Sequence, residues 1–290
     1  MSIRITRRDF AKVAGAAALA GVGVLAQSTP VKAGSNAGVL KKALKWEMID
    51  EPEMSVTDKF KMVKEIGFEG VEPTADSVRK VGVAEFAKAI DASGIPVHGI
   101  VQGWTFSGIN KTADWAKELG ATSVLIVTGK VTETMPYAKN WEVTQAEMRK
   151  AIPHYEQQEI QLLIENVWNN FQLSPLEMAY YIDELDSEWC NSYFDIGNVH
   201  RFGWPEQWIP VLGERIKKLD LKEYSTEIRD KQGPWKGFSP KIGDGTIAWD
   251  KVVEELAKIN YSGWVTAEVG GGNREHLADI AQRMAKVLDI

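Results

Sequence analysis

Four acidic residues in the second half of the chain each end a short apolar run that is typical of a buried strand. They are Glu165, Asp195, Asp220 and Glu268. A carboxylate at the end of a buried strand is costly to desolvate unless a positive group meets it. Four such endings in succession favour one shared cation over four separate ones. Oxygen ligands suit a hard divalent ion, so we predict that these residues bind Mn²⁺ or Mg²⁺.

Salt bridges are the alternative use of these carboxylates. Lys217, Lys218 and Lys222 lie close to Asp220 in the sequence, and lysine pairs readily with carboxylates. A cluster that lysine neutralises would need no metal, and the sequence leaves this interpretation open. In both cases the strands that carry the acids must end at one place.

Strand-like and helix-like segments alternate from about residue 40 onward, which is the pattern of an α/β fold. The predicted strands are residues 43–48, 70–72, 97–102, 123–128, 161–165, 192–195, 216–221 and 264–269. The predicted helices are residues 58–66, 83–92, 112–119, 143–158, 175–184, 249–259 and 274–287. Eight strands in about 250 residues predict one (β/α)8 TIM barrel. An open doubly wound sheet is the alternative, but no glycine-rich phosphate turn follows the first strand.

In such a barrel, functional groups gather where the strands end and the loops begin. The four carboxylates then follow strands five to eight. Trp46 and Glu72 end strands one and two, while Trp104 and Trp168 follow strands three and five. The chain has 11 tryptophans, and flat rings beside polar groups suit the stacking and hydrogen bonding of a sugar. We therefore predict a small-molecule carbohydrate substrate.

Short motifs along the chain resemble one known family. They are GFEGVE (67–72), IEN (164–166), FDIGN (194–198), RIKKLDLKE (215–223), IGDGTI (242–247) and AE (267–268). Over about residues 40–288 the chain resembles the xylose isomerase-like barrels, which include ketose 3-epimerases, hydroxypyruvate isomerase-like proteins and inosose isomerases and dehydratases. The resemblance implies a metal held by Glu, Asp, His and Glu from strands five to eight. Glu165, Asp195 and Glu268 fall on three of these positions.

Two positions depart from the family pattern. Where relatives read His-x-Lys-Asp, this chain has Asp220 followed by Lys222, which makes the site more anionic and favours Mg²⁺, Mn²⁺ or Ca²⁺ over Zn²⁺. Lys222 or Lys241 could supply the compensating charge. Asn198 stands where relatives often have histidine, with His200 two residues further on. The predicted substrate contacts are Trp46, Glu72, His98, Trp104, Asn166, Trp168, Asn198, His200, Lys222 and Lys241. For His98, a core position is the alternative.

The resemblance implies that Glu165 and Glu268 bind the metal and also transfer protons. A divalent ion can stabilise an enediolate while carboxylates act as acid and base. The sequence thus predicts a metal-dependent carbohydrate isomerase or epimerase. A periplasmic lyase or hydratase acting on 3-keto sugars or glycosides, and a non-catalytic sugar-binding barrel, are the alternatives. A repair endonuclease is disfavoured, because the chain has only four histidines and an acidic surface cannot bind the DNA backbone.

The first 33 residues read as a twin-arginine export signal. Arg7 and Arg8 precede an uncharged stretch at residues 13–26, which is shorter than the roughly 20 residues of a membrane span. We predict cleavage after Ala26 or Ala33, a barrel at residues 34–290, and a periplasmic or otherwise exported protein that meets the twin-arginine translocase. A membrane anchor or a disordered tail is the alternative.

The remaining chain is strongly acidic. The whole sequence has 34 basic and 40 acidic residues, and removal of residues 1–33 takes away five basic residues and one acidic residue, which leaves a net charge of −10. This charge argues against nucleic acid as a partner. Cys190 is the single cysteine and cannot form an intramolecular disulfide. The sequence leaves a homo-oligomer open.

Overall fold

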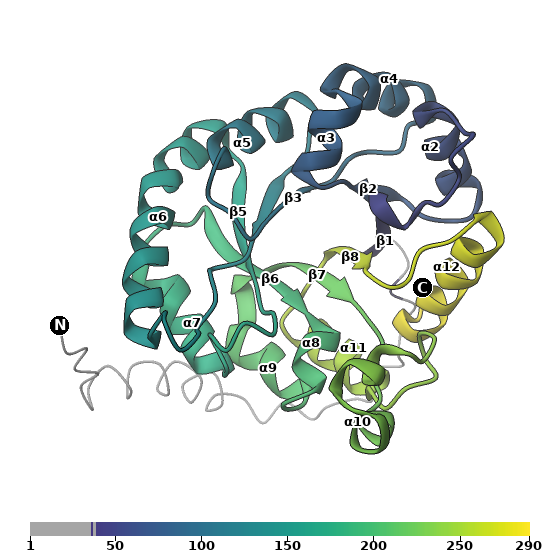
Figure 1. Cartoon of the computed structure of the whole chain (residues 1–290). Helices are drawn as coiled ribbons and strands as arrows, with labels where there is room; N and C mark the ends of the chain where they lie inside the picture. The colour runs from purple at the N-terminus through teal and green to yellow at the C-terminus, as the bar shows by residue number, and fades with distance from the viewer. Residues whose placement is uncertain (1–35, 37–38) are drawn as a thin grey trace, which may run out of the picture.

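The computed structural model describes residue 36 and residues 39–290 of the chain (Figure 1). The export signal predicted for residues 1–33 lies outside the described residues and stays a prediction. None of the described helices combines the length and apolar composition that a bilayer span requires.

The described residues form an eight-stranded parallel sheet that curls into a barrel, with the helices around its outside (Figure 1). The strand order is β2-β1-β8-β7-β6-β5-β4-β3. Between β2 and β3 the ring is joined only by isolated bridges, Val71 to Val97 and Thr74 to Val101, among the residues described. The barrel is therefore nearly closed, and the predicted (β/α)8 fold is confirmed. The strands are β1 (Leu40–Lys45), β2 (Gly70–Glu72), β3 (Ile100–Gly103), β4 (Ser123–Ile126), β5 (Gln161–Glu165), β6 (Cys190–Asp195), β7 (Ile216–Leu221) and β8 (Gly263–Ala267).

Two strand predictions at the chain ends of the barrel were wrong in their bounds. The first strand was predicted at residues 43–48, but β1 ends at Lys45 and residues 46–48 form a 3-10 turn, η1 (Trp46–Met48). The last strand was predicted to reach residue 269, but β8 ends at Ala267, so Glu268 follows the strand directly. The ladder between these two strands ends with Leu44 opposite Ala267, and Lys45 is opposite Glu72 of β2. These pairings are not visible in any one segment alone.

The helices cover the outer face of the strands. The start of α7 has a local cause in the sequence: the Ser174 hydroxyl accepts a hydrogen bond from the Glu177 amide, and Pro175 occupies the first turn. The fourth predicted helix starts at Tyr137 rather than at residue 143. The helices are α2 (Val56–Glu65), α3 (Ala75–Val81), α4 (Val83–Ser93), α5 (Ile109–Glu118), α6 (Tyr137–Gln158), α7 (Pro175–Glu184), α8 (Ile196–His200), α9 (Pro205–Leu212), α10 (Thr226–Gln232), α11 (Trp249–Lys258) and α12 (Arg274–Leu288), with the short 3-10 turns η2 (Gly213–Arg215) and η3 (Pro234–Phe238).

The interior of the barrel contains a polar network rather than apolar layers alone. The Tyr193 hydroxyl donates to Glu72 Oε2 at 2.8 Å and lies 2.8 Å from the Thr266 hydroxyl. Thr266 in turn lies 3.2 Å from His98 Nε2, and Lys218 Nζ lies 3.1 Å from His98 Nδ1. Both ring nitrogens of His98 thus have protein partners. Buried polar groups of this kind favour a single arrangement of their side chains, because any other arrangement would leave some of them without a hydrogen-bond partner.

Gly197, in the first turn of α8, allows this helix to lie against the end of β7. A Cβ atom at residue 197 would lie 2.5 Å from Lys222 Cβ and 2.9 Å from the Lys222 carbonyl oxygen. The neighbouring atoms belong largely to the backbone, so the clash cannot be relieved by a rotamer change. This glycine therefore fixes the distance between α8 and Lys222.

We predict that Gly197→Ala lowers the free energy of unfolding by about 1–3 kcal/mol, the usual cost of overpacking. Urea denaturation of both proteins measures the difference. Gly203→Ala is the matched control, because its Cβ atom would meet its nearest neighbour at 3.6 Å. Equal stability of the two variants would show that α8 can shift without cost.

Candidate metal centre

One carboxylate comes from each of four neighbouring strands, at the same end of the barrel. Glu165 ends β5, Asp195 ends β6, Asp220 lies in β7 and Glu268 follows β8. Asp195 and Asp220 are direct partners in the ladder between β6 and β7. One oxygen from each of the four side chains lies within 4.8 Å of the others. The structure thus brings together the four residues that the sequence singled out, and metal binding by them stays a prediction.

Lys222 lies among three of these carboxylates. Its Nζ atom is 2.6 Å from Asp195 Oδ2, 3.0 Å from Glu268 Oε2 and 3.9 Å from Glu165 Oε1. Burial of the ammonium opposes its charge, but the surrounding carboxylates, Asp195 first, hold the pKa of Lys222 well above its usual value. Lys222 is therefore a fixed positive charge inside the cluster.

Lys45 is a second lysine of the site, and the sequence analysis missed it. Its Nζ atom lies 2.6 Å from Glu72 Oε2 and 2.9 Å from Asp220 Oδ1, and all three side chains are buried. Burial lowers the pKa of Lys45, yet Asp220 and Glu72 raise it overall to well above its usual value. Because the first strand was predicted to run to residue 48, Lys45 was not recognised as a strand end. The sequence signal that could have identified Lys45 is a lysine at the end of an apolar strand.

The four carboxylates differ in their electrostatic surroundings. Burial, followed by the charge of Glu268, raises the pKa of Glu165 well above its usual value. Burial also raises the pKa values of Asp195 and Asp220. For Glu268 burial has the same sign, but Lys222 and Lys45 outweigh it and lower the pKa to about 2. The pKa values of the two glutamates are thus shifted in opposite directions. This is the arrangement that separates an acid from a base.

The charge and the donor atoms of the cluster fit a divalent cation. Five carboxylates, including Glu72, face only two paired lysines, Lys45 and Lys222, at this end of the described barrel. Three inward carboxylate oxygens accept no hydrogen bond of good geometry from the described residues, although a lysine ammonium lies within ion-pair distance of each oxygen. They are Asp195 Oδ2, Asp220 Oδ1 and Glu268 Oε2. Converging carboxylate oxygens that outnumber the lysines beside them are what a hard cation requires, so the residues fit the metal.

Two asparagines orient the carboxylates. Asn166 exchanges two hydrogen bonds of 2.8 Å with the backbone N–H and C=O of Asp195. The backbone N–H of Asn198 donates to Asp195 Oδ1 at 2.7 Å, and its side-chain amide donates to Glu165 Oε1 at 3.3 Å. Both residues were predicted to contact substrate, and the structure shows them tying β5 to β6.

An aromatic wall stands beside the cluster. Trp168 donates from its indole N–H to the Asn198 carbonyl at 2.9 Å. Its ring lies 4.6 Å from Trp235 and 4.8 Å from Phe238, measured between ring centroids. Trp235 is 73% exposed and belongs to η3, which the sequence analysis did not predict. The wall therefore combines one predicted residue with two that only the tertiary structure brings to it.

Three other predicted substrate contacts, Trp46, Trp104 and Glu72, lie in different parts of the structure. Trp46 packs on Phe60 and Phe86 of α2 and α4, and Trp104 is exposed in the loop after β3. Glu72 reaches the cluster through Lys45.

Three predicted residues do not join the four carboxylates. His98 lies in the barrel interior and stacks on Trp264, which is the core position given as its alternative. Lys241 pairs with Asp279 of α12 on the surface, so it is Lys45 rather than Lys241 that joins Lys222 at the cluster. His200 lies 3.0 Å from the Thr246 hydroxyl through Nε2.

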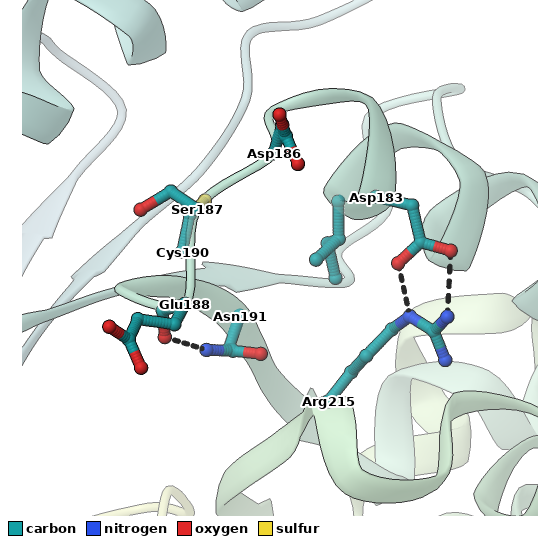
Figure 2. A pocket seen from close by; sticks show the side chains of 8 residues that line it. Asp183, Asp186, Ser187, Glu188, Cys190, Asn191 and Arg215 are labelled. Atoms are coloured by element: carbon teal, nitrogen blue, oxygen red, sulfur yellow. Dashed lines mark hydrogen bonds and ion pairs between the residues drawn. The ribbon is translucent and has the colours of Figure 1, made fainter.

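A hollow of about 400 Å³ lies near the beginning of β6, at the opposite end of the strand from Asp195. Figure 2 shows two contacts among its polar groups: Arg215 donates two hydrogen bonds to Asp183, and Asn191 donates to the Glu188 carbonyl. Active sites of such barrels lie at the other end of the strands, so this hollow does not belong to the candidate metal centre.

Comparisons with known proteins agree with this architecture. A family model described as "Xylose isomerase-like TIM barrel" matches residues 60–289. The structure of 3-keto-D-glucoside 4-epimerase from E. coli aligns with a TM-score of 0.71 at 14% identity, over 86% of this chain and 98% of that one. D-Allulose 3-epimerase from Methylomonas sp. aligns with a TM-score of 0.70 at 14% identity, over 85% and 96% of the two chains. An uncharacterized protein of Methanocaldococcus jannaschii is 25% identical over 96 residues, which span 33% of this chain and 31% of that protein.

We predict that Lys222→Met destabilises the metal-free protein by about 3 kcal/mol, because removal of one partner leaves buried carboxylates uncompensated. Mn²⁺ should then raise the melting temperature of the variant more than that of the unchanged protein. Thermal denaturation with chelator and with Mn²⁺ measures both effects. Lys241→Met, which removes an exposed lysine, is the control and should behave like the unchanged protein. A Lys222→Met protein of full stability in chelator would contradict the role of this lysine.

Proposed function

We propose that this chain, which belongs to the xylose isomerase-like TIM barrel family, is a divalent-metal-dependent carbohydrate isomerase or epimerase. The observation that carries the proposal is the cluster of four converging carboxylates in which two glutamates have opposed pKa shifts. Two proteins of similar fold bear the names of sugar epimerases, which supports a sugar as the substrate.

Glu165, Asp195, Asp220 and Glu268 would hold the metal. When bound, Mn²⁺ or Mg²⁺ would polarise the substrate carbonyl and stabilise the negative charge that develops on its oxygen. The protein itself must then remove a proton from the carbon next to the carbonyl and return one. For an epimerase the proton returns on the opposite face, and for an isomerase it returns to the neighbouring carbon.

The opposed pKa shifts of the two glutamates support one division of the proton-transfer roles. Glu268, whose pKa is held at about 2 by Lys222 and Lys45 against burial, is ionised at neutral pH and can accept a proton. Glu165, whose pKa is raised by burial and by Glu268, can carry a proton and donate it. Asn198 holds Glu165 through its amide, so the acid keeps its direction while the substrate reacts.

The surroundings of the cluster favour an unphosphorylated sugar. Lys45 and Lys222 are both paired with carboxylates, so neither is available to bind a phosphate. The wall of Trp168, Trp235 and Phe238 offers flat apolar surface next to the polar cluster, which suits the C–H face of a sugar ring. A lyase or hydratase acting on 3-keto sugars is the second candidate, because a protonated Glu165 could equally protonate a leaving oxygen.

Hydrogen exchange with solvent tests the proposal. The protein is incubated in D₂O with ketoses and with 3-keto glucosides, in the presence of Mn²⁺, Mg²⁺ or chelator. We expect deuterium at the carbon next to the carbonyl, and loss of this exchange in chelator. A new unsaturated product would favour the lyase. Binding without any exchange would leave a sugar-binding barrel and contradict the enzyme.

We predict that Glu268→Gln lowers the rate of deuterium exchange at least about a hundredfold, since the amide cannot accept the proton. NMR of the labelled sugar measures the rate, and circular dichroism should show an unchanged fold. Glu275→Gln on the exposed start of α12 is the control. A Glu268→Gln protein with full exchange would remove this residue from the mechanism.

We predict that Asp220→His changes metal preference. Imidazole is the ligand that relatives are expected to carry here, so Zn²⁺ should bind about tenfold more tightly and Mg²⁺ more weakly. Competition titration with a chelating dye measures both affinities. Asp279→His on the surface of α12 serves as the control for an added histidine. An unchanged metal profile would mean that Asp220 is not a ligand.

A further inference from the structure

A cavity of about 420 Å³ lies among the helices that follow β6 and β7. Its wall includes His200 at the end of α8, Glu206 at the start of α9 and Lys251 in α11. In Figure 1 these helices lie on one side of the barrel, and α9 packs against α11. Among the described residues that line the cavity, none belongs to the carboxylate cluster. The cavity thus shares no residue with the cluster, although its Arg201 and Phe202 contact Trp168 of the aromatic wall. Its volume is in the range of small-molecule pockets.

Two buried polar atoms at this cavity have no hydrogen-bond partner within the described residues. They are His200 Nδ1 and Glu206 Oε2. His200 is 5% exposed, and its other nitrogen is already placed against the Thr246 hydroxyl. A buried polar atom without a partner costs free energy, so a ligand that supplies the missing partners would bind favourably.

The chemistry of the two atoms restricts the ligand. An ionised Glu206 can only accept a hydrogen bond, while His200 Nδ1 donates or accepts according to its tautomer. A hydroxyl group donates and accepts, so it can satisfy both. A carboxylate ion has no proton to donate to Glu206, and a phosphate ion would place its negative charge against the Glu206 carboxylate. A metal ion is disfavoured because Arg201, Arg229 and Lys251 line the same cavity.

Exposed aromatic rings stand beside these polar atoms. Phe202 and Trp204 line the cavity and are 55% and 57% exposed. The Arg201 guanidinium lies 4.8 Å from the Phe202 ring centroid and 4.2 Å from that of Trp168, so it holds the loop between α8 and α9 against the barrel. Flat rings next to hydroxyl partners are the features that recognise a sugar.

We propose that this cavity is a second carbohydrate-binding site, in which hydroxyls of one sugar ring bind Glu206 and His200 while the ring stacks on Trp204 or Phe202. The site is separate from the candidate metal centre and goes beyond the proposed isomerase activity. His200, predicted from the sequence to contact the substrate, then serves this second site instead.

The test uses the full chain in chelator, so that binding at the metal centre does not contribute. The indole N–H signal of Trp204 is identified in a ¹H–¹⁵N spectrum by its loss in Trp204→Phe. Titration with methyl β-D-glucoside and with D-glucose should move this signal in a saturable way. In Glu206→Gln the dissociation constant should rise about tenfold, because a hydrogen bond to a charged acceptor becomes one to a neutral group. Glu227→Gln, an exposed glutamate of the neighbouring α10, should leave the affinity unchanged.

Absence of a saturable shift with both sugars would overturn the proposal, as would equal affinity in Glu206→Gln and the unchanged protein. D-Glucuronate and inorganic phosphate are titrated in parallel. If only these anions move the Trp204 signal, the cavity is an anion site and the proposal is wrong. Every titration is done without metal. A negative result therefore contradicts only the second sugar site and leaves the deuterium-exchange test of the isomerase unaffected.

Discussion

The compensation of buried carboxylates by two lysines is the constraint on which the functional end of this barrel depends. Glu72, Asp195 and Asp220 are fully buried, and each has a lysine ammonium within 3.0 Å. Without Lys45 and Lys222, the desolvation of these charges would have no counterweight. The same lysines leave the cluster with an excess of negative charge. The two lysines thus offset part of the buried charge and leave the cluster anionic, as a metal site requires.

The two lysines contact different carboxylates of the site. Lys45 joins Glu72 to Asp220 and so connects the first two strands to β7. It also lies 4.9 Å from the Tyr193 ring centroid, above the polar network inside the barrel. Lys222 lies among Asp195, Glu268 and Glu165, where a metal would compete for the same oxygens. Lys45 therefore links the strands of the barrel and, together with Lys222, lowers the pKa of Glu268 against burial. Burial and the charge of Glu268 raise the pKa of Glu165.

The presence of Asp220, where the family resemblance implies a histidine, gains a physical explanation from Lys45. A fourth carboxylate would add repulsion to a site that is already acidic, and its pKa is raised by burial despite the lysine beside it. The ion pair with Lys45 fixes the direction of Asp220 and offsets part of its charge. An imidazole at residue 220 would need no such partner. We infer that Lys45 and Asp220 belong together as a pair, in place of the single neutral ligand that the family resemblance implies.

The sequence by itself determined the barrel, the ends of strands five to seven and the set of four carboxylates. Strand periodicity and helix caps are local signals, and parallel strands must end on one side of the sheet. It did not determine the end of β1, the partner of Asp220, or the presence of Trp235 and Phe238 beside Trp168. Those depend on contacts between residues far apart in the chain, such as Lys45 with Asp220. His98 and Lys241 show the same limit, because a histidine or lysine near a strand end can face the interior, the site or the solvent. Only the register of the nearly closed barrel and the packing of the loops decided which of these surroundings each side chain has.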